Sequence, residues 1–179
     1  MRATVAILTA LTPVAVLGSA PATAQESASV LELADQGFLA CHSPNAVRKT
    51  CKSIETLERV RDDLYNSTTL MAVGHGVTLE IYTPLWVVDD IVCGSMREQD
   101  LMAGVVRLDG REVAPQLAAP ALNQALQQVR PFLDQQICTR YQPSGADFVA
   151  KNALGETYRP DWDEPVKMID PADGYRVAR

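Results

Sequence analysis

Two groups of residues carry side chains that could do chemistry. The first is the pair Cys41 and Cys51, with His42 beside the first cysteine and a polar loop between the two. Thiolates and imidazoles serve as zinc ligands and as nucleophiles, whereas paired cysteines form disulfides. The second group is the segment 158–164, whose aromatic rings could stack on a sugar and whose carboxylates could act as acid and base. Its candidate residues are Tyr158, Asp161, Trp162, Asp163 and Glu164.

The first 24 residues indicate the compartment of the protein, and with it the redox environment of the cysteines. Arg2 is followed by an apolar run from Ala3 to Leu17, and Ala22-Thr23-Ala24 fits the small-x-small pattern before a cleavage point. The run is shorter than the roughly 20 apolar residues of a membrane-spanning helix. We therefore predict a cleaved signal peptide over 1–24, a mature chain that starts at Gln25, no membrane span after cleavage, and a periplasmic or secreted protein.

The four cysteines are predicted to form two disulfides. An even number of cysteines in an oxidising compartment favours pairing. Cys41 and Cys51 flank a short loop between strand-like segments, which predicts a local bridge and leaves Cys93 to pair with Cys138. We expect the main helix, by packing on the sheet, to bring the second pair together. Loss of the local bridge should cost less stability, because the entropic contribution grows with the length of the closed loop.

Metal and haem sites are not supported by the spacing. A c-type haem needs C-x-x-C-H, and a structural zinc site needs four cysteine and histidine ligands at short spacings. No C-x-x-C occurs, and the second histidine, His75, lies far along the chain from His42. We expect no cofactor and no bound metal.

Length and charge set the class of protein. Removal of the leader leaves about 155 residues, which suits one domain over 25–179. The formal net charge is -6, and the only charged residue of the leader is Arg2, so the mature chain is more acidic still. The basic residues form no stripe. Nucleic acid and anionic membrane surfaces are therefore poor partners.

Hydrophobic periodicity predicts an α+β fold. Residues 77–83 alternate as a strand, and Asp109-Gly110 is the dipeptide of a two-residue hairpin turn. Apolar residues at spacings of three and four predict the main helix at about 118–136, and a short helix is expected at about 95–103. The class follows as a mostly antiparallel sheet with segregated helices and two disulfides.

Three local predictions concern prolines and helix capping. Pro84 should interrupt the strand that starts at Val77, which would imply an edge position or a bulge. Pro120 should lie in the first turn of the main helix. Ser95 and Glu98 have the S-x-x-E spacing of a capping box, which predicts that the short helix begins there.

Catalytic motifs are mostly missing from the sequence. Gly74-His75-Gly76 lacks the third glycine of a dinucleotide-binding loop and is typical of a hairpin turn. No G-x-S-x-G, H-E-x-x-H or P-loop occurs. We favour a non-enzymatic protein that binds another envelope or secreted component. One form would be an inhibitor of a basic secreted hydrolase, with the loop closed by the local disulfide as a rigid plug.

Two alternatives stay open, a small hydrolase acting on envelope glycan through the 158–164 carboxylates, and a structural envelope protein. A hydrolase requires the carboxylates of 158–164 to converge in a cleft, whereas a protein without this activity can have them pointing separately into solvent. His42 is expected to be an exposed loop residue. Substitutions at His42 and in 158–164 should change stability by less than about 0.5 kcal/mol.

Overall fold

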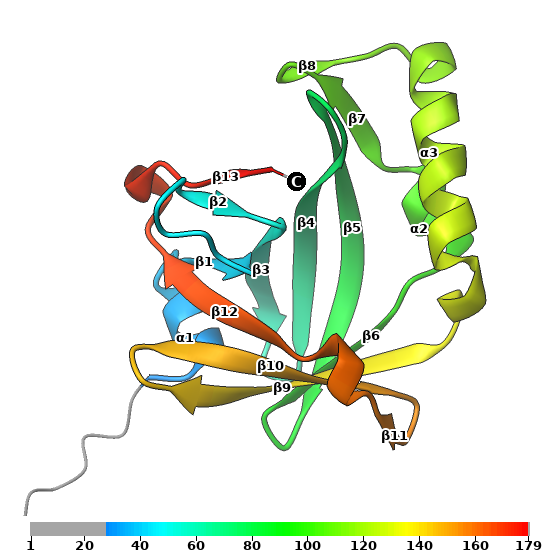
Figure 1. Ribbon diagram of the computed structural model, residues 1–179. Coiled ribbons are helices and arrows are strands. Elements are labelled where there is room, and N and C mark those ends of the chain that lie inside the picture. Colours follow the sequence, from blue (N-terminus) through cyan, green and yellow to red (C-terminus); the bar gives the residue numbers. More distant parts are fainter. Residues whose placement is uncertain (1–27, 179) are drawn as a thin grey trace, which may run out of the picture.

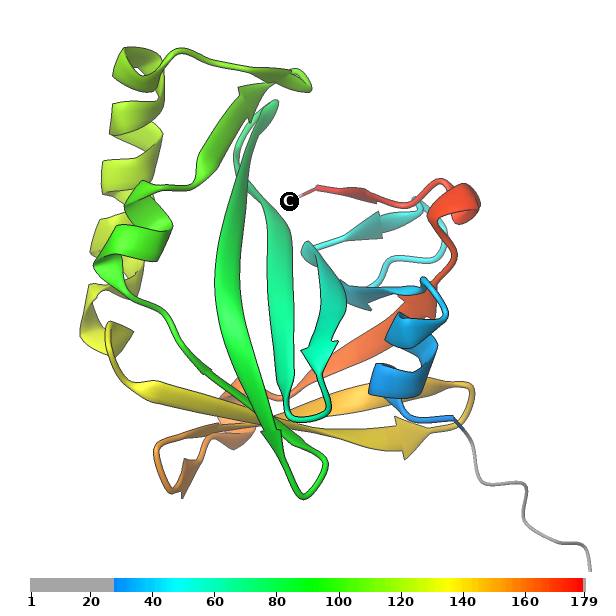
Figure 2. The ribbon, with the colours of Figure 1, turned by 180° about the vertical axis from the view of Figure 1, so that it is seen from behind.

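The main body of the protein is a closed barrel of eight antiparallel strands (Figures 1 and 2). The computed structural model describes residues 28–178. The predicted signal peptide over 1–24 and the predicted mature N-terminus at Gln25 lie outside the described residues. The barrel strands are β1 (Leu39–His42), β3 (Ser53–Arg61), β4 (Leu64–Gly74), β5 (Val77–Val88), β6 (Ile91–Ser95), β9 (Gln136–Ser144), β10 (Asp147–Leu154) and β12 (Glu164–Ile169).

Hydrogen-bonded neighbours run in the order β4-β3-β1-β12-β10-β9-β6-β5, and β5 pairs with β4 to close the ring. The β4–β5 hairpin is the longest pairing, from Leu64↔Trp86 to Gly74↔Val77. β12 inserts between β1 and β10, so the first strand of the chain meets the last strand of the barrel. Closure leaves these eight strands without the two free edges of an open sheet.

The predicted α+β class is therefore wrong, because the fold is a β-barrel. The segments expected as strands are strands, but they pair into a ring rather than a sheet with helices on one face. The period of two that marks a strand does not say which strands become neighbours. Closure depends on long-range pairing, which local patterns do not contain.

Additional strands extend the barrel at its rim. β7 (Val105–Leu108) pairs with the start of β5 and carries β8 (Arg111–Glu112), and β11 (Thr157–Tyr158) pairs with β10. The predicted turn at Asp109-Gly110 joins β7 to β8, with positive φ at both residues. β2 (Thr50–Cys51) and β13 (Arg176–Val177) form a separate parallel pair beside the barrel wall.

Two helical layers cover different parts of the barrel (Figure 1). α1 (Val30–Asp35) begins with a capping box between Ser29 and Glu32 and packs on an apolar cluster at one end of the barrel. The buried members of that cluster are Val30, Ala34, Ala40, Leu57, Tyr65, Phe148, Ala150 and Val166. Within residues 28–178, no helix is long and apolar enough to cross a membrane.

α3 (Pro115–Val129) and α2 (Glu98–Met102) pack on the extended part of the β4–β5 hairpin and form a second core. Its buried members are Leu79, Ile81, Leu101, Val106, Ala118, Leu122, Ala125 and Leu126. The predicted helix at 118–136 is shifted, because it starts at Pro115 and ends in a 3-10 turn, Arg130–Phe132. Pro120 lies inside the helix rather than in its first turn.

The short helix also starts later than predicted, and the capping box at Ser95 and Glu98 does not form. Arg97 occupies the N-cap without a side-chain hydrogen bond, and α2 spans only Glu98–Met102. Ser95 is the last residue of β6, where it pairs with Gln136 of β9. Ser95, which the local pattern predicted as the helix cap, is therefore part of a strand pair instead.

Pro84 does not interrupt its strand, because β5 continues to Val88. β7 pairs with β5 only as far as Glu80, and β6 begins its pairing at Leu85. Among the strands of residues 28–178, only β4 therefore pairs with residues 81–84, which leaves their other side as a local edge. A proline is tolerated at such a local edge, since its missing N–H is not required by a neighbour.

Both disulfides form in the predicted pairing. Cys41 of β1 is bonded to Cys51 of β2, and the pair packs with Ile54 and Ile169 on the outside of the barrel. Cys93 and Cys138 lie directly opposite each other on the neighbouring strands β6 and β9. Strand pairing, rather than packing of the main helix on a sheet, brings the second pair together.

Gly104 positions β7 against the second core, and replacing it by alanine should be costly. An added Cβ would lie 2.8 Å from Leu79 Cδ1, 2.9 Å from the carbonyl oxygen of Leu101 and 3.0 Å from that of Glu80. Two of these atoms belong to the backbone and cannot rotate away. We expect Gly104→Ala to lower the free energy of unfolding in urea by about 1–3 kcal/mol.

The matched control is Gly74→Ala, where the nearest atom to an added Cβ is Val77 Cβ at 3.4 Å, an ordinary contact. We expect that variant to stay within about 0.5 kcal/mol of the wild type. Equal losses in the two variants would show that the close approach at Gly104 does not control packing.

Candidate functional site

The barrel interior contains a polar cavity of about 330 Å³. Alternate residues of each strand point inward, and in this half of the barrel many of them are polar. Seven hydroxyl-bearing side chains, one histidine and two glutamates line the cavity, together with the apolar side chains of Leu85, Val92, Met96 and Ile137. The polar lining residues are His42, Ser53, Glu55, Ser67, Thr69, Thr83, Ser95, Thr139, Tyr141 and Glu164.

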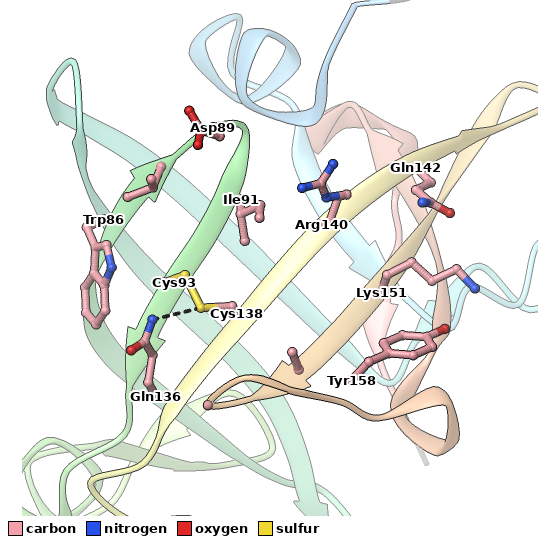
Figure 3. Close-up of a pocket in the computed structure, with 13 residues that line it drawn as sticks. Trp86, Asp89, Ile91, Cys93, Gln136, Cys138, Arg140, Gln142, Lys151 and Tyr158 are labelled. Carbon is pink, nitrogen blue, oxygen red and sulfur yellow. Dashed lines mark hydrogen bonds between the residues drawn. A yellow bond between two sulfur atoms is a disulfide. The ribbon is translucent and has the colours of Figure 1, made fainter.

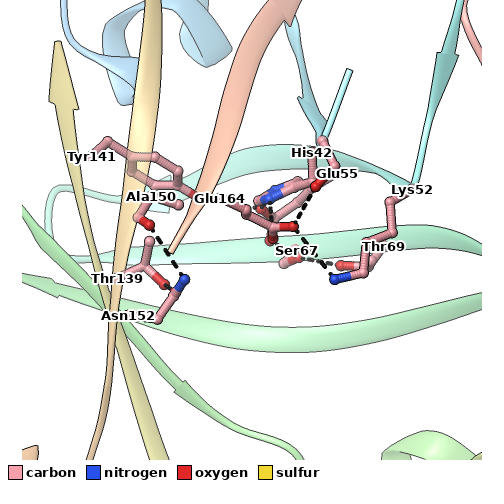
Figure 4. A network of polar contacts seen from close by, with 11 residues as sticks. His42, Lys52, Glu55, Ser67, Thr69, Thr139, Tyr141, Ala150, Asn152 and Glu164 are labelled. Atoms are coloured by element: carbon pink, nitrogen blue, oxygen red, sulfur yellow. Dashed lines mark hydrogen bonds and ion pairs between the residues drawn. The ribbon is translucent and has the colours of Figure 1, made fainter. Parts of the chain in front are cut away.

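His42 is held between two carboxylates inside this cavity (Figure 4). Its Nδ1 lies 3.0 Å from Oε1 of Glu164, and its Nε2 lies 3.4 Å from Oε2 of Glu55. The three side chains come from β1, β12 and β3, three consecutive strands of the ring. An imidazolium can donate from both ring nitrogens, so this arrangement favours the charged form of His42.

The two glutamates have further partners. The Ser67 hydroxyl donates to Oε1 of Glu55, and the Tyr141 hydroxyl donates to Oε2 of Glu55 over 3.4 Å. Ser43 donates to Oε2 of Glu164 over 2.9 Å. Lys52 lies 3.5 Å from the same oxygen but is 74% exposed, so solvent screens that ion pair.

The environment sets the charges of this network. Burial acts to lower the pKa of His42, but hydrogen bonds and charges from Glu164 and Glu55 outweigh burial and raise it to about 9. Burial acts to raise the pKa of Glu164, yet His42, Lys52 and Ser43 hold it at about 2. The pKa of Glu55 is also lowered, because His42, Ser67 and Tyr141 outweigh its burial. At neutral pH the cluster is therefore one imidazolium between two carboxylates.

These shifts predict how stability depends on pH. The contribution of His42 is fully present below pH 6.5 and is lost as the pH rises through about 9. The contribution of Glu164 is present above pH 4.5 and is lost as the pH falls through about 2. We expect the network to stabilise the fold most between these limits, and the loss on the alkaline side to be on the order of 2–3 kcal/mol.

Proton NMR titration of the His42 ring tests this directly, with a midpoint expected near 9. Urea unfolding of the wild type and of His42→Gln between pH 6.5 and 9 gives the matching stability curves, and the slope should be shallower in the variant. A His42 midpoint near 6.5 would contradict the charged network.

The structure places the sequence-predicted candidates in different surroundings. His42 is not an exposed loop residue, since its side chain is 13% exposed and faces the cavity. The expectation that substitutions of His42 hardly change stability is therefore wrong, because it assumed an exposed side chain. Glu164 meets it there, although the two residues lie far apart along the chain. Glu164 also lines an open hollow of about 480 Å³ outside the barrel, with Ser43 and Lys52, so its carboxylate lies between the cavity and solvent.

The rest of the 158–164 segment does not converge on the cavity. The Tyr158 hydroxyl donates to Asp163, which also accepts from Lys151 over 2.6 Å. Asp161 pairs with Arg159. The Trp162 ring packs edge-on against Phe132 at 5.0 Å between ring centroids. The predicted cluster is therefore divided: Glu164 lies in the barrel cavity, Tyr158 and Asp163 form contacts with each other and with Lys151, and Asp161 and Trp162 have separate partners.

Among the polar residues of the cavity, only His42 and Glu164 were selected from the sequence, and the other members of the charged network, namely Glu55, Ser67 and Tyr141, were missed. Ser53 and Glu55 alternate with Ile54 along β3, so these two polar residues point inward, on the same face as the buried Leu57, and Ile54 lies outside under β13. An alternating strand indicates which residues share a face. It does not indicate which face is inside when the interior is polar.

The chain matches no protein-family model, no curated protein and no solved structure. Within residues 28–178, no group of three or more histidine, cysteine, aspartate or glutamate side chains is arranged to hold a metal ion.

Proposed function

We propose that the protein is an exported, non-enzymatic binding protein that holds a small molecule with hydroxyl or amino groups inside the barrel. This proposal rests on the polar cavity, whose volume falls at the lower end of the range for small-molecule binding sites. The two disulfides support export to an oxidising compartment, periplasmic or extracellular.

The charges of the cavity support the ligand class. Glu55 and Glu164 together carry two negative charges, and His42 supplies one positive charge between them. The interior is therefore net negative, and Thr69, Thr83 and other hydroxyl groups offer hydrogen bonds that can act as donor or acceptor. A neutral polyol or a small amine fits such a lining, whereas an anion would be repelled.

The hydrolase alternative has less support. Glycoside cleavage needs a carboxylic acid whose pKa is raised so that it can protonate the leaving group. The pKa values of Glu164, Glu55, Asp161 and Asp163 are all lowered, by hydrogen bonds or ion pairs with His42, Arg159 or Lys151 that outweigh any burial. His42 is protonated and bound on both nitrogens, so it is also a poor general base.

A cavity-filling variant tests the binding proposal. Thr83→Leu would occupy the cavity, and Thr78→Leu on the same strand is the control, because Thr78 lines an outer groove instead. Wild-type protein and both variants are purified from the native envelope and analysed by native mass spectrometry for bound small molecules. We expect a ligand on the wild type and on Thr78→Leu, and a loss of it in Thr83→Leu. An equal ligand content in all three would contradict the proposal.

A second candidate is binding to another exported protein through the Cys41–Cys51 loop. Val47 at the tip of this loop is 95% exposed. The loop is preorganised by the disulfide and by paired backbone hydrogen bonds between Asn45 and Thr50 of 2.7 and 3.1 Å. Because the loop is a tight turn, Val47 would enter a partner as an apolar knob. Co-purification of a protein that is lost in Val47→Asp would favour this candidate.

A further inference from the structure

The two disulfides lie in different environments. Cys41 and Cys51 are 0% and 1% exposed and lie beneath Tyr175 and Val177. Cys93 is 5% exposed, but Cys138 is partly exposed, and this bridge lines a groove of about 770 Å³ on the outer wall of the barrel (Figure 3). Reagents from solution can therefore reach the second bridge without unfolding the protein.

The sulfur of Cys138 has one polar contact, and a cationic side chain lines the same groove. The Gln136 amide donates to Cys138 Sγ over 3.0 Å. Arg140 follows two residues later on the same face of β9, and among residues 28–178 it has no ion-pair partner. Donors and cations of this kind stabilise a thiolate. Trp86 and Tyr158 lie toward opposite sides of the same groove (Figure 3).

The strands that carry this bridge are also held by backbone pairing. β6 and β9 are in register from Ile91↔Arg140 to Ser95↔Gln136, with Cys93↔Cys138 in the middle. If the disulfide is reduced, this ladder keeps the two sulfurs opposite each other. Re-oxidation then needs no rearrangement of the barrel.

We propose that Cys93–Cys138 is a thiol-exchange site for small thiols that carry a carboxylate. Arg140 binds the carboxylate through its planar fork of donors, which directs the thiol towards the neighbouring Cys138. This site lies on the outer face of the barrel and does not depend on the ligand proposed for the interior.

The exchange has two balanced steps. A thiolate attacks Cys138 Sγ, so a new S–S bond joins the small thiol to Cys138 and the Cys93–Cys138 bond breaks. Cys93 leaves as a thiolate and takes a proton from water. A second thiolate then attacks the sulfur of the bound small thiol and releases the small-molecule disulfide. Cys138 becomes the thiolate stabilised by Gln136 and Arg140, so two thiols are oxidised and one protein disulfide is reduced.

Folded, full-length exported protein is incubated with mercaptopropionate, which carries a carboxylate, or with mercaptoethanol, which is neutral. Free thiols are trapped by alkylation and mapped by mass spectrometry, and rates are expressed per thiolate. We expect Cys93 and Cys138 to react, with a mixed disulfide on Cys138, while Cys41 and Cys51 stay bonded as an internal control. Mercaptopropionate should react about tenfold faster than mercaptoethanol.

Arg140→Ala should remove that preference, whereas Arg111→Ala, an exposed arginine on β8, should keep it. Circular dichroism confirms that both variants are folded. The proposal is overturned if both disulfides are reduced together, if neither is reduced in the folded protein, or if Arg140→Ala leaves the preference for mercaptopropionate unchanged.

Discussion

Replacement of His42 by leucine is expected to lower the free energy of unfolding at pH 7 by about 3–5 kcal/mol. The substitution removes the positive charge between Glu55 and Glu164 and leaves two carboxylates facing each other across an apolar side chain. Removing one member of a buried charge cluster costs far more than removing an exposed charge, because the remaining charges lose their compensation. Urea unfolding at pH 7 measures the loss.

The electrostatic part of this loss of stability can be separated from the part that comes from lost packing. The triple variant His42→Leu/Glu55→Gln/Glu164→Gln removes the negative charges as well and should recover a large part of the stability. Asp161→Ala is the exposed control and should change stability by less than about 0.5 kcal/mol. A loss below about 1 kcal/mol for His42→Leu would show that the network contributes little to folding.

Removal of the long disulfide, by Cys93→Ala/Cys138→Ala, is expected to cost about 4 kcal/mol. The two cysteines are 45 residues apart in sequence, and opening a loop of this size increases the entropy of the unfolded chain. The folded barrel should change little, because β6 and β9 remain paired around the site. Unfolding in urea and the near-ultraviolet circular dichroism of the folded state are the two measurements.

The local bridge provides a contrast. Its cysteines are 10 residues apart, so the entropic contribution is about 3 kcal/mol. Both sulfurs are buried against Ile54 and Ile169, so Cys41→Ala/Cys51→Ala also loses packing. We therefore expect the free energies of unfolding of the two double variants to differ by less than the loop lengths alone predict. If Cys93→Ala/Cys138→Ala were unfolded without denaturant, strand pairing alone would not be sufficient to hold β6 and β9 together.

Local features of the fold were predictable from sequence because neighbouring residues determine them. The strand that contains Leu79 and Ile81 and the turn at Asp109-Gly110 were predicted from alternation and turn chemistry, and both are present. Ser29 and Glu32 form a capping box, whereas the same spacing at Ser95 and Glu98 does not. The difference lies in β9, which pairs with Ser95 and is remote in sequence.

The candidate site was only partly predictable, for a related reason. His42 and Glu164 were both selected, but nothing in the sequence joins them, because β1 and β12 become neighbours of the same ring only after closure. Glu55 was missed because an alternating strand is normally assigned its apolar face as the inner face. In β3 both faces carry apolar residues, since Ile54 is covered from outside by the β2–β13 pair and Leu57 is buried on the inner face beside Glu55.

The pairing of β1 with β12 also determines the order in which the protein can fold. Leu39 pairs with Ile169, which follows it by 130 residues, so β1 is synthesised long before its partner strand. Until then β1 has β3 on one side and an open edge on the other, and His42 has no Glu164. Folds that depend on pairing between strands remote in sequence typically form in milliseconds to seconds. An unpaired strand edge can associate with other chains during that time. A chain truncated before residue 164 would keep that open edge, because it lacks the strand that pairs with β1 and the carboxylate that pairs with His42.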